Sequence, residues 1–240
     1  MNIRTSLCLF LLSLSVGSAE ASVVMQGNRV VFNASSESQT VSFINNDNFP
    51  YIVQTWTSVG ENDSASDKSS GPFVLSPSVF KIPPHESQIV RMIYSQAGKK
   101  YNSERLYYLH FIQVPAVPTD LQNKNKLLLV INSTVKVFVR PDNLAVSHND
   151  MFKLVTYRMS DMNGRCHFLI TNNSPYILNA VEYKVSDTQG FHWSKIGMVA
   201  PGARDEFYNK CRKSNDQSPF LIKIINDYGV SQNITINRSE

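Results

Sequence analysis

The chain has 240 residues, of which 42% are hydrophobic and 18% charged, and its formal net charge is +4. This balance is that of a folded globular protein and excludes an intrinsically disordered chain. Lysines and arginines are scattered along the sequence and form no basic patch, so the composition gives no indication of nucleic-acid binding. The length fits one large domain or two domains of about 110 residues.

Residues 1–21 have the pattern of a cleaved secretory signal. Arg4 provides a positive charge, residues 7–16 are apolar but too few to span a bilayer, and residues 19–21 fit a small-x-small cleavage site. We therefore expect the mature chain to begin at Ser22 and to be exported. No later apolar run is long enough to cross a membrane, so we expect no stable membrane anchor.

Short strand patterns separated by polar turns follow one another after Ser22. In the first half of the chain they cover residues 30–32, 40–44, 51–57, 73–75, 88–94, 106–114 and 127–140. About seven short strands in this length describe an immunoglobulin-like β-sandwich. The sequence therefore predicts a first domain over residues 22–141, which ends at a proline.

A polar segment over residues 142–150 is the expected linker to a second domain. The same rhythm of strands and turns then continues from residue 151 to 240. Its strand patterns cover residues 153–157, 167–171, 176–185, 206–208, 220–225 and 230–236. The sequence thus predicts an all-β protein of two immunoglobulin-like sandwich domains, the second smaller than the first.

The strand pattern over residues 127–140 begins with five apolar residues in a row. Sandwich strands usually have one apolar and one solvated face. Apolar residues on both faces indicate either a doubly buried strand or a strand whose hydrophobic face awaits a partner. Lys136 and Arg140 share one face, because side chains alternate along a strand. Beside a domain boundary they could bind a carboxylate in a cleft, although solvated edge charges would give the same pattern.

Nothing in the sequence indicates an enzyme, a cofactor or a metal site. Cys166 and His167 point to opposite faces of a strand, so they cannot form a catalytic dyad. The other histidines lack metal-ligand spacing, and no nucleophile motif or phosphate loop occurs. Signal cleavage would leave two cysteines, Cys166 and Cys211, and an even number in an oxidising compartment favours a disulfide.

Six segments carry a resemblance to a known family. They are residues 28–32 (NRVVF), 50–56 (PYIVQTW), 71–77 (GPFVLSP), 135–141 (VKVFVRP), 173–176 (NSPY) and 225–229 (INDYG). Each is a weak signal alone, but in this order, at this spacing and behind a signal peptide they make a specific match. The sequence resembles the periplasmic pilus, or fimbrial, chaperones of the chaperone/usher pathway. The connection over residues 115–126 is short and lacks cysteine, which resembles the branch with a short F1–G1 loop.

The resemblance implies two domains set at an angle, with a cleft between them. It also implies a periplasmic protein that binds, folds and caps pilus subunits and delivers them to an outer-membrane usher. Capping would occur by donor-strand complementation, in which the chaperone lends a strand to a subunit that lacks one. The alternative is an exported immunoglobulin-like adhesin or a pilus structural subunit. A subunit would carry a free N-terminal extension, for which residues 22–28 are too short.

Two sets of partner-binding residues follow from the resemblance. Arg29 and Lys136 match the residues that hold the C-terminal carboxylate of the subunit by charge-assisted hydrogen bonds. Leu127, Leu129 and Ile131 match the alternate apolar residues that insert into the subunit's groove. The residues between them, 128 and 130, are expected to point into the chaperone's own core. An exposed apolar face of this kind favours association, so a self-capped dimer is an expected form of the free protein.

A third set matches a buried charge network that fixes the angle between the domains, and it consists of Glu104, Arg140 and Asp227. Arg140 is therefore expected to serve this network in place of the partner's carboxylate. The sequence departs from the family at residues 102–103, which are not an acidic-basic pair, at His110, usually asparagine, and at Val139, usually aromatic. These departures put details of the cleft rim in doubt.

Overall fold

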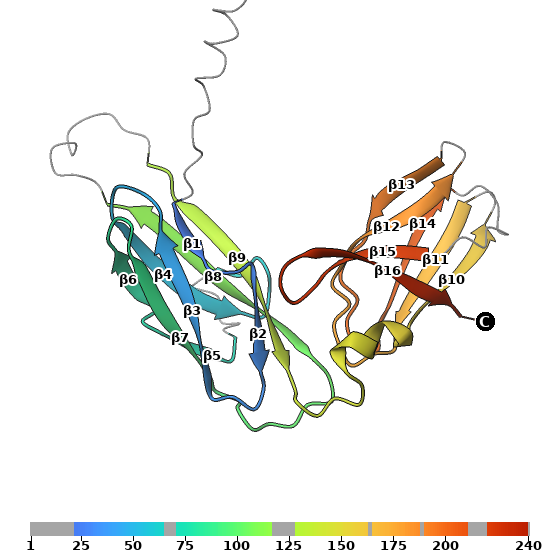
Figure 1. Cartoon of the computed structure of the whole chain (residues 1–240), viewed down its shortest axis with the longest axis horizontal. Helices are drawn as coiled ribbons and strands as arrows, with labels where there is room; N and C mark the ends of the chain where they lie inside the picture. The colour runs from blue at the N-terminus through green and yellow to red at the C-terminus, as the bar shows by residue number, and fades with distance from the viewer. Residues whose placement is uncertain are drawn as a thin grey trace, which may run out of the picture.

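The computed structural model describes residues 22–64, 71–116, 128–162, 165–187, 190–210 and 220–239. Figure 1 shows two β-domains set at an angle and joined at one end. None of the helices in the described ranges is long and apolar enough to cross a membrane. The expected signal, Leu127 and Cys211 lie outside these ranges.

The N-terminal domain is a sandwich of two sheets. The four-stranded sheet has the order β1 (Val23–Met25), β3 (Ser38–Asn45), β7 (Ser87–Tyr94) and β5 (Phe73–Ser76). The five-stranded sheet has the order β2 (Arg29–Asn33), β9 (Ile131–Arg140), β8 (Arg105–Pro115), β4 (Tyr51–Ser58) and β6 (Val79–Ile82). This is the sandwich that the strand patterns predict, with the short strands β1 and β6 in addition.

Alternation of buried and exposed residues places the core between these sheets. Along β4, Tyr51, Val53 and Thr55 are buried and the residues between them are not. Phe43 on the facing sheet meets Phe111 of β8 edge to face, with ring centroids 5.1 Å apart. Such strands fold as a sandwich because each has one apolar face to bury.

The first two strands lie at the edges of the two sheets, one in each. β1 pairs antiparallel with β3, and after a turn at Gly27 (φ 87°) the chain crosses over, so that β2 pairs parallel with β9. A positive φ of this size suits glycine. The parallel pairing joins residues 29–33 to residues 136–140 only, so it covers one half of β9 and not the other.

The second domain forms one curled sheet of seven strands. Its order is β13 (Gly190–Lys195), β12 (Ala180–Asp187), β15 (Phe220–Ile225), β16 (Ser231–Arg238), β10 (Val155–Met162), β11 (Arg165–Asn172) and β14 (Arg204–Lys210). A short parallel pairing of β10 with β16 joins its two halves. Ile170, Leu178 and Ile222 are fully buried between these halves.

The segment expected as a linker belongs in part to the second domain. Leu144 and Val146 pack against the core of that domain. The 3₁₀ helix η2 (His148–Leu154) follows, with the hydroxyl of Ser147 accepting from the backbone N–H of Asp150. The strand expected over residues 153–157 is therefore η2 followed by β10. The strand expected over 176–185 begins only at Ala180, after an isolated bridge of Leu178 with Val199.

Candidate functional site

The two predicted carboxylate-binding cations lie side by side. Arg29 on β2 is the direct partner of Lys136 on β9, and partner residues in a sheet share a face. Both side chains are half-buried. Arg29 lines a cavity of about 460 Å³ between the domains, together with Phe138 and Asp227. The sheet therefore presents two adjacent cations where the domains meet.

Arg29 is held from both domains. Its Nη1 donates to the backbone oxygen of Ile225 in the second domain at 3.3 Å, and its Nε donates to Oδ1 of Asn28 at 3.1 Å. The guanidinium carbon lies 6.0 Å from the ring centroid of Phe138. Burial lowers the pKa of Arg29, and the negative charge of Asp227 opposes this effect.

The three residues predicted as an inter-domain network lie in direct contact. Arg140 Nε donates to Glu104 Oε1 at 2.8 Å, while Nη1 and Nη2 donate to the two oxygens of Asp227 at 2.7 and 2.9 Å. The second oxygen of Glu104 accepts from the backbone N–H of Ile177 at 3.0 Å. Glu104 and Arg140 belong to the N-terminal domain and the other two residues to the second. One arginine thus joins the domains with a bidentate ion pair.

The electrostatics of this network are set by burial and by Arg140. Burial raises the pKa of Glu104, although Arg140 favours its charged form. Burial also acts on Asp227, but the hydrogen bonds and charge of Arg140 outweigh it and lower its pKa. His148 Nδ1 lies 3.5 Å from Asp227, and burial followed by the charge of Arg140 lowers the pKa of this histidine. His148 stands in no motif of the sequence, so sequence reasoning missed its place here.

The expected faces of the apolar segment before β9 need correction. Leu128, Leu129, Val130 and Ile131 are all exposed, by 44%, 66%, 47% and 44%. Residues 128 and 130 therefore do not point into the core of the N-terminal domain. The reason is that β9 pairs with β8 only from Ile131 onward, opposite Gln113, so no strand of the described ranges pairs with residues 128–130. The strand expected from residue 127 begins at 131.

The core-facing side of β9 continues the predicted donor face. Val135, Val137 and Val139 lie in the hydrophobic core. Side chains alternate along a strand, so Ile131 has the same orientation as these valines but lies beyond the end of the core. Leu129 follows the same alternation only if the strand extends past its observed start. Of the predicted insertion residues, Ile131 thus projects from the side of β9 that the protein's own core uses further along.

One edge of β9 is open over residues 131–135. β8 pairs with one side of the strand at residues 131–139, whereas β2 pairs with the other side only at residues 136–140. Within the described part of the chain no strand covers the remaining edge. Unpaired backbone groups on an edge strand can add a strand from another chain. The open edge ends at Lys136, where the cations lie.

His110, one departure from the family pattern, is fully accommodated. Its ring is buried and stacks on Trp56 with centroids 5.1 Å apart. Ser58 Oγ lies 2.7 Å from Nε2, and Thr134 Oγ1 lies 3.0 Å from Nδ1. Burial lowers the pKa of His110. The side chain therefore serves as a neutral link between β4, β8 and the open half of β9.

The remaining expectations from the sequence are a disulfide between Cys166 and Cys211 and the lack of a metal site. Cys166 on β11 is buried and disulfide-bonded. Its expected partner, Cys211, lies outside the described residues, so the pairing stays a prediction. Among the residues that the structure describes, no three His, Cys, Asp or Glu side chains are grouped to hold a metal ion.

Comparisons with known proteins cover nearly the whole chain after residue 21. Residues 22–145 match the family "Pili and flagellar-assembly chaperone, PapD N-terminal domain", and residues 150–236 match "Pili assembly chaperone PapD, C-terminal domain". Chaperone protein FimB/FhaD of Bordetella pertussis is 31% identical over 193 residues, which cover 78% of each chain.

Solved structures share the fold. The Pseudomonas aeruginosa CupB2 chaperone has a TM-score of 0.71 at 23% identity and covers 90% of this chain and 100% of its own. The Salmonella enterica SafB chaperone, solved in complex with the SafA pilin, has a TM-score of 0.67 at 20% identity, covering 92% and 99%. With both domains matched in order, the chain belongs to the PapD-like family of pilus-assembly chaperones, and it is a chaperone and not an enzyme.

Proposed function

We propose that this chaperone captures pilus subunits in the periplasm at the open edge of β9 and the cations beside it. The observation that carries the proposal is their continuity, because the unpaired edge over residues 131–135 ends where Arg29 and Lys136 lie adjacent. A subunit strand would pair with the edge, and its C-terminal carboxylate would bind between the cations. The pilin bound by the related SafB chaperone supports this class of partner.

The two parts of the site would do different work. Charge-assisted hydrogen bonds to a carboxylate are short and directional, so the cations would fix the register of the subunit strand. Leu129 and Ile131, with Leu127 before them, would then fill the hydrophobic gap of the subunit. Each such aliphatic side chain contributes roughly 1.5–3 kcal/mol on full burial. Backbone pairing adds affinity that depends little on subunit sequence.

Delivery to an outer-membrane usher is the expected next step. The network of Glu104, Arg140 and Asp227 would keep the two domains at one angle while a subunit is bound. An ion pair between domains is suited to this, because any domain arrangement that separates the pair would leave a partly buried charge without a partner.

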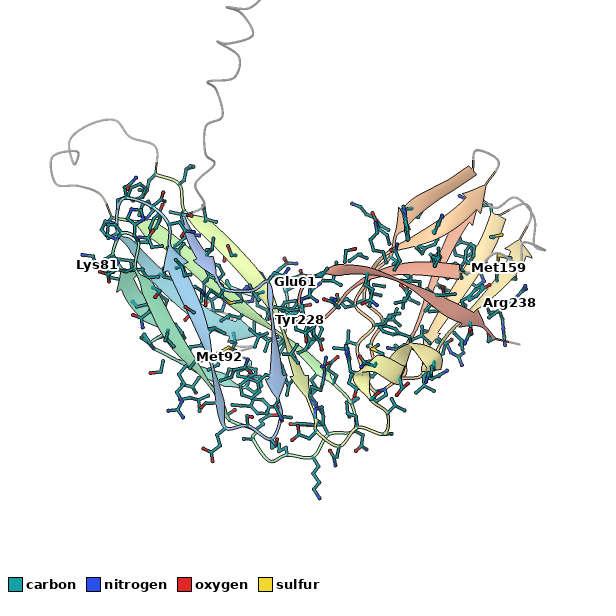
Figure 2. The ribbon with its side chains drawn as sticks, viewed as in Figure 1. Glu61, Lys81, Met92, Met159, Tyr228 and Arg238 are labelled. Carbon is teal, nitrogen blue, oxygen red and sulfur yellow. The ribbon has the colours of Figure 1, made fainter. Side chains whose placement is uncertain are left out.

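Co-purification from periplasm tests the proposal. The tagged wild-type protein should bring down pilus subunits that mass spectrometry identifies. Arg29→Ala and Lys136→Ala should each reduce capture at least tenfold while the melting temperature stays unchanged. Lys81→Ala is the matched control, since Lys81 (labelled in Figure 2) is exposed on β6, at the opposite edge of the five-stranded sheet from β2. Wild-type yields of subunit with either cation removed would refute the carboxylate site.

A further inference from the structure

The turn between β15 and β16 reaches across to the N-terminal domain (Figure 1), and Tyr228, labelled in Figure 2, belongs to it. The turn is fixed internally by Asn226. Its Oδ1 accepts from the backbone N–H groups of Tyr228 and Val230 at 3.1 and 3.0 Å, and its backbone oxygen accepts from Gly229 at 2.9 Å. A turn with its own hydrogen bonds satisfied is a rigid support for a neighbouring group.

Asn28 connects this turn to the predicted carboxylate site. Its Nδ2 donates to the backbone oxygen of Gly229 at 3.2 Å, and its Oδ1 accepts from Arg29 Nε at 3.1 Å. Gly229 has φ 79°, and a Cβ there would lie 2.0 Å from Asn28 Oδ1. The close approach therefore depends on glycine, and the amide of Asn28 joins two groups from different domains.

Arg29 is consequently held on one side of its guanidinium. Nε is bonded to Asn28 and Nη1 to the backbone oxygen of Ile225, whereas Nη2 has no hydrogen bond within the described part of the chain. A long side chain loses rotamer freedom when it binds a ligand, and groups that already restrict it reduce this cost. Side chains that lock a binding residue from behind are the usual means of such preorganisation.

We propose that Asn28 is a positioning residue for the subunit's carboxylate. It couples Arg29 to the turn of the second domain, so that the guanidinium presents its Nη2 side to the cleft before a subunit arrives. The inference rests on the proposed function, because it assigns Asn28 a role in the same carboxylate site. It assigns this role to an uncharged residue that touches the anchor and not the ligand.

The test uses a fluorescent peptide with the last residues of the subunit that co-purifies with the wild-type protein. It is made with a free C-terminal carboxylate and, separately, with a carboxamide. Anisotropy gives the dissociation constant of each form for the full-length mature chaperone. Asn28→Ala should weaken the carboxylate form about three- to tenfold, the effect of one lost hydrogen bond, and leave the carboxamide form unchanged. Gly229→Ala, which displaces the Asn28 amide, should act in the same direction.

Double-mutant cycles separate positioning from other roles. If Asn28 acts through Arg29, Asn28→Ala combined with Arg29→Ala should bind like Arg29→Ala alone, whereas combined with Lys136→Ala the effects should add. Asn33→Ala, at the other end of β2, is the control and should bind as wild type.

Three outcomes would overturn the inference. Asn28→Ala could bind the carboxylate form as tightly as wild type, could weaken both peptide forms equally, or could add fully to Arg29→Ala. Failure of the proposed function is distinct, because the wild-type chaperone would then bind the carboxylate and carboxamide forms equally well.

Discussion

Arg29 and Lys136 are neighbours in register but are held differently. Arg29 has hydrogen bonds to both domains and lies over Phe138. Lys136 lies on β9 between β2 and β8, and its side chain has no hydrogen bond or ion pair within the described residues. A guanidinium offers a fixed fork for a carboxylate, whereas an ammonium group acts as a mobile point charge. The arginine is therefore suited to set the orientation of a bound carboxylate and the lysine to add attraction.

Asp227 gives the network a pH dependence with a definite sign. Its pKa lies below the ordinary value of 3.8 in the folded protein. Its carboxylate therefore stabilises the folded state above that pH, and this stabilisation is lost as the pH falls through the folded pKa. Asp227→Asn should reduce stability at pH 7 by about 1–2 kcal/mol, since the pair is partly exposed. Thermal unfolding of both proteins from pH 7 to pH 3 measures the difference.

This difference between wild type and Asp227→Asn should shrink as the pH falls below about 4, where Asp227 of the unfolded chain takes up a proton, and should vanish once the pH passes the lower pKa of the folded protein. The comparison at each pH removes most of the contribution of Glu104, whose pKa burial shifts the other way. A difference that stays constant or grows on acidification would show that the charge of Asp227 is not what stabilises the contact.

The disulfide of Cys166 is a second prediction at the scale of single residues. Pairing with Cys211 would close a loop of about 45 residues and, from the lost chain entropy of the unfolded state, stabilise the second domain by about 3–4 kcal/mol. Thiol titration of the unreduced, denatured mature protein should find no free cysteine. Cys211→Ser should lower the melting temperature and leave Cys166 as one reactive thiol after denaturation. Two free thiols in the wild-type protein would contradict the pairing.

At the scale of elements, β9 is one strand with two environments. Its second half lies between β2 and β8 and contributes Val137 and Val139 to the core. Its first half has a neighbour on one side only, and its side chains there are mostly exposed. One half of β9 is thus completed within the protein, and the other half has the open edge that the proposed function assigns to a partner strand.

Three charge substitutions along this segment should separate the two environments. Val135→Glu places a carboxylate in the core and should unfold the N-terminal domain, at a cost of several kcal/mol. Ile131→Glu has the same orientation beyond the core, so the free protein should melt as wild type but should lose subunit capture. Val130→Glu should leave folding normal and reduce capture less. Circular dichroism melts and periplasmic co-purification measure the two effects.

Two results with the same variants would contradict the assignment of β9 as the strand that inserts into the subunit. If Ile131→Glu unfolds the free protein as severely as Val135→Glu, the exposed half of the strand is part of the core. If Ile131→Glu captures subunits at the wild-type level, this face of β9 does not insert into the partner.

Strand periodicity predicted most of these elements, because alternation reports which face of a strand is buried. It predicted β4 and β7 within a residue or so and β15 over its full range. It could not predict that β9 starts at Ile131, since that depends on where β8 and β2 end, which is a property of their register. For the same reason it assigned residues 128 and 130 to a core that does not extend so far.

The sequence predicted some residues of the site but not all of the contacts between the domains. The residues that share a motif with a family, such as Arg29 and Arg140, could be found because each stands in a recognisable segment. Asn28 also stands in one of these segments, but its contact is with a turn 201 residues away, and His148 lies beside Asp227. Such contacts follow from the packing of the domains, and no local pattern in the sequence records them.

At the scale of the whole molecule, contacts among the described residues join the domains at more than one place. They include the network around Arg140, the backbone hydrogen bond from Glu104 N–H to the oxygen of Pro175, and the contact of Asn28 and Arg29 with the turn after β15. Each domain has its own hydrophobic core. Each domain can thus remain folded when the contacts between the domains are weakened. We therefore expect such a change to alter the angle between the domains and not the fold of either one.

Glu104→Ala should change that angle without unfolding either domain. Glu104 is nearly inaccessible to solvent and joins Arg140 to the backbone of Ile177. Its loss therefore leaves a half-buried arginine with one partner fewer and the amide of Ile177 without its acceptor. Small-angle X-ray scattering should show a larger radius of gyration and a broader distance distribution, while circular dichroism keeps the β-sheet spectrum. Glu206→Ala, an exposed carboxylate beside His167 on the second domain, is the control and should scatter as wild type. Scattering curves that superimpose for Glu104→Ala and wild type would mean that the angle is set elsewhere, and the contact of Asn28 with Gly229 would then be the one to remove.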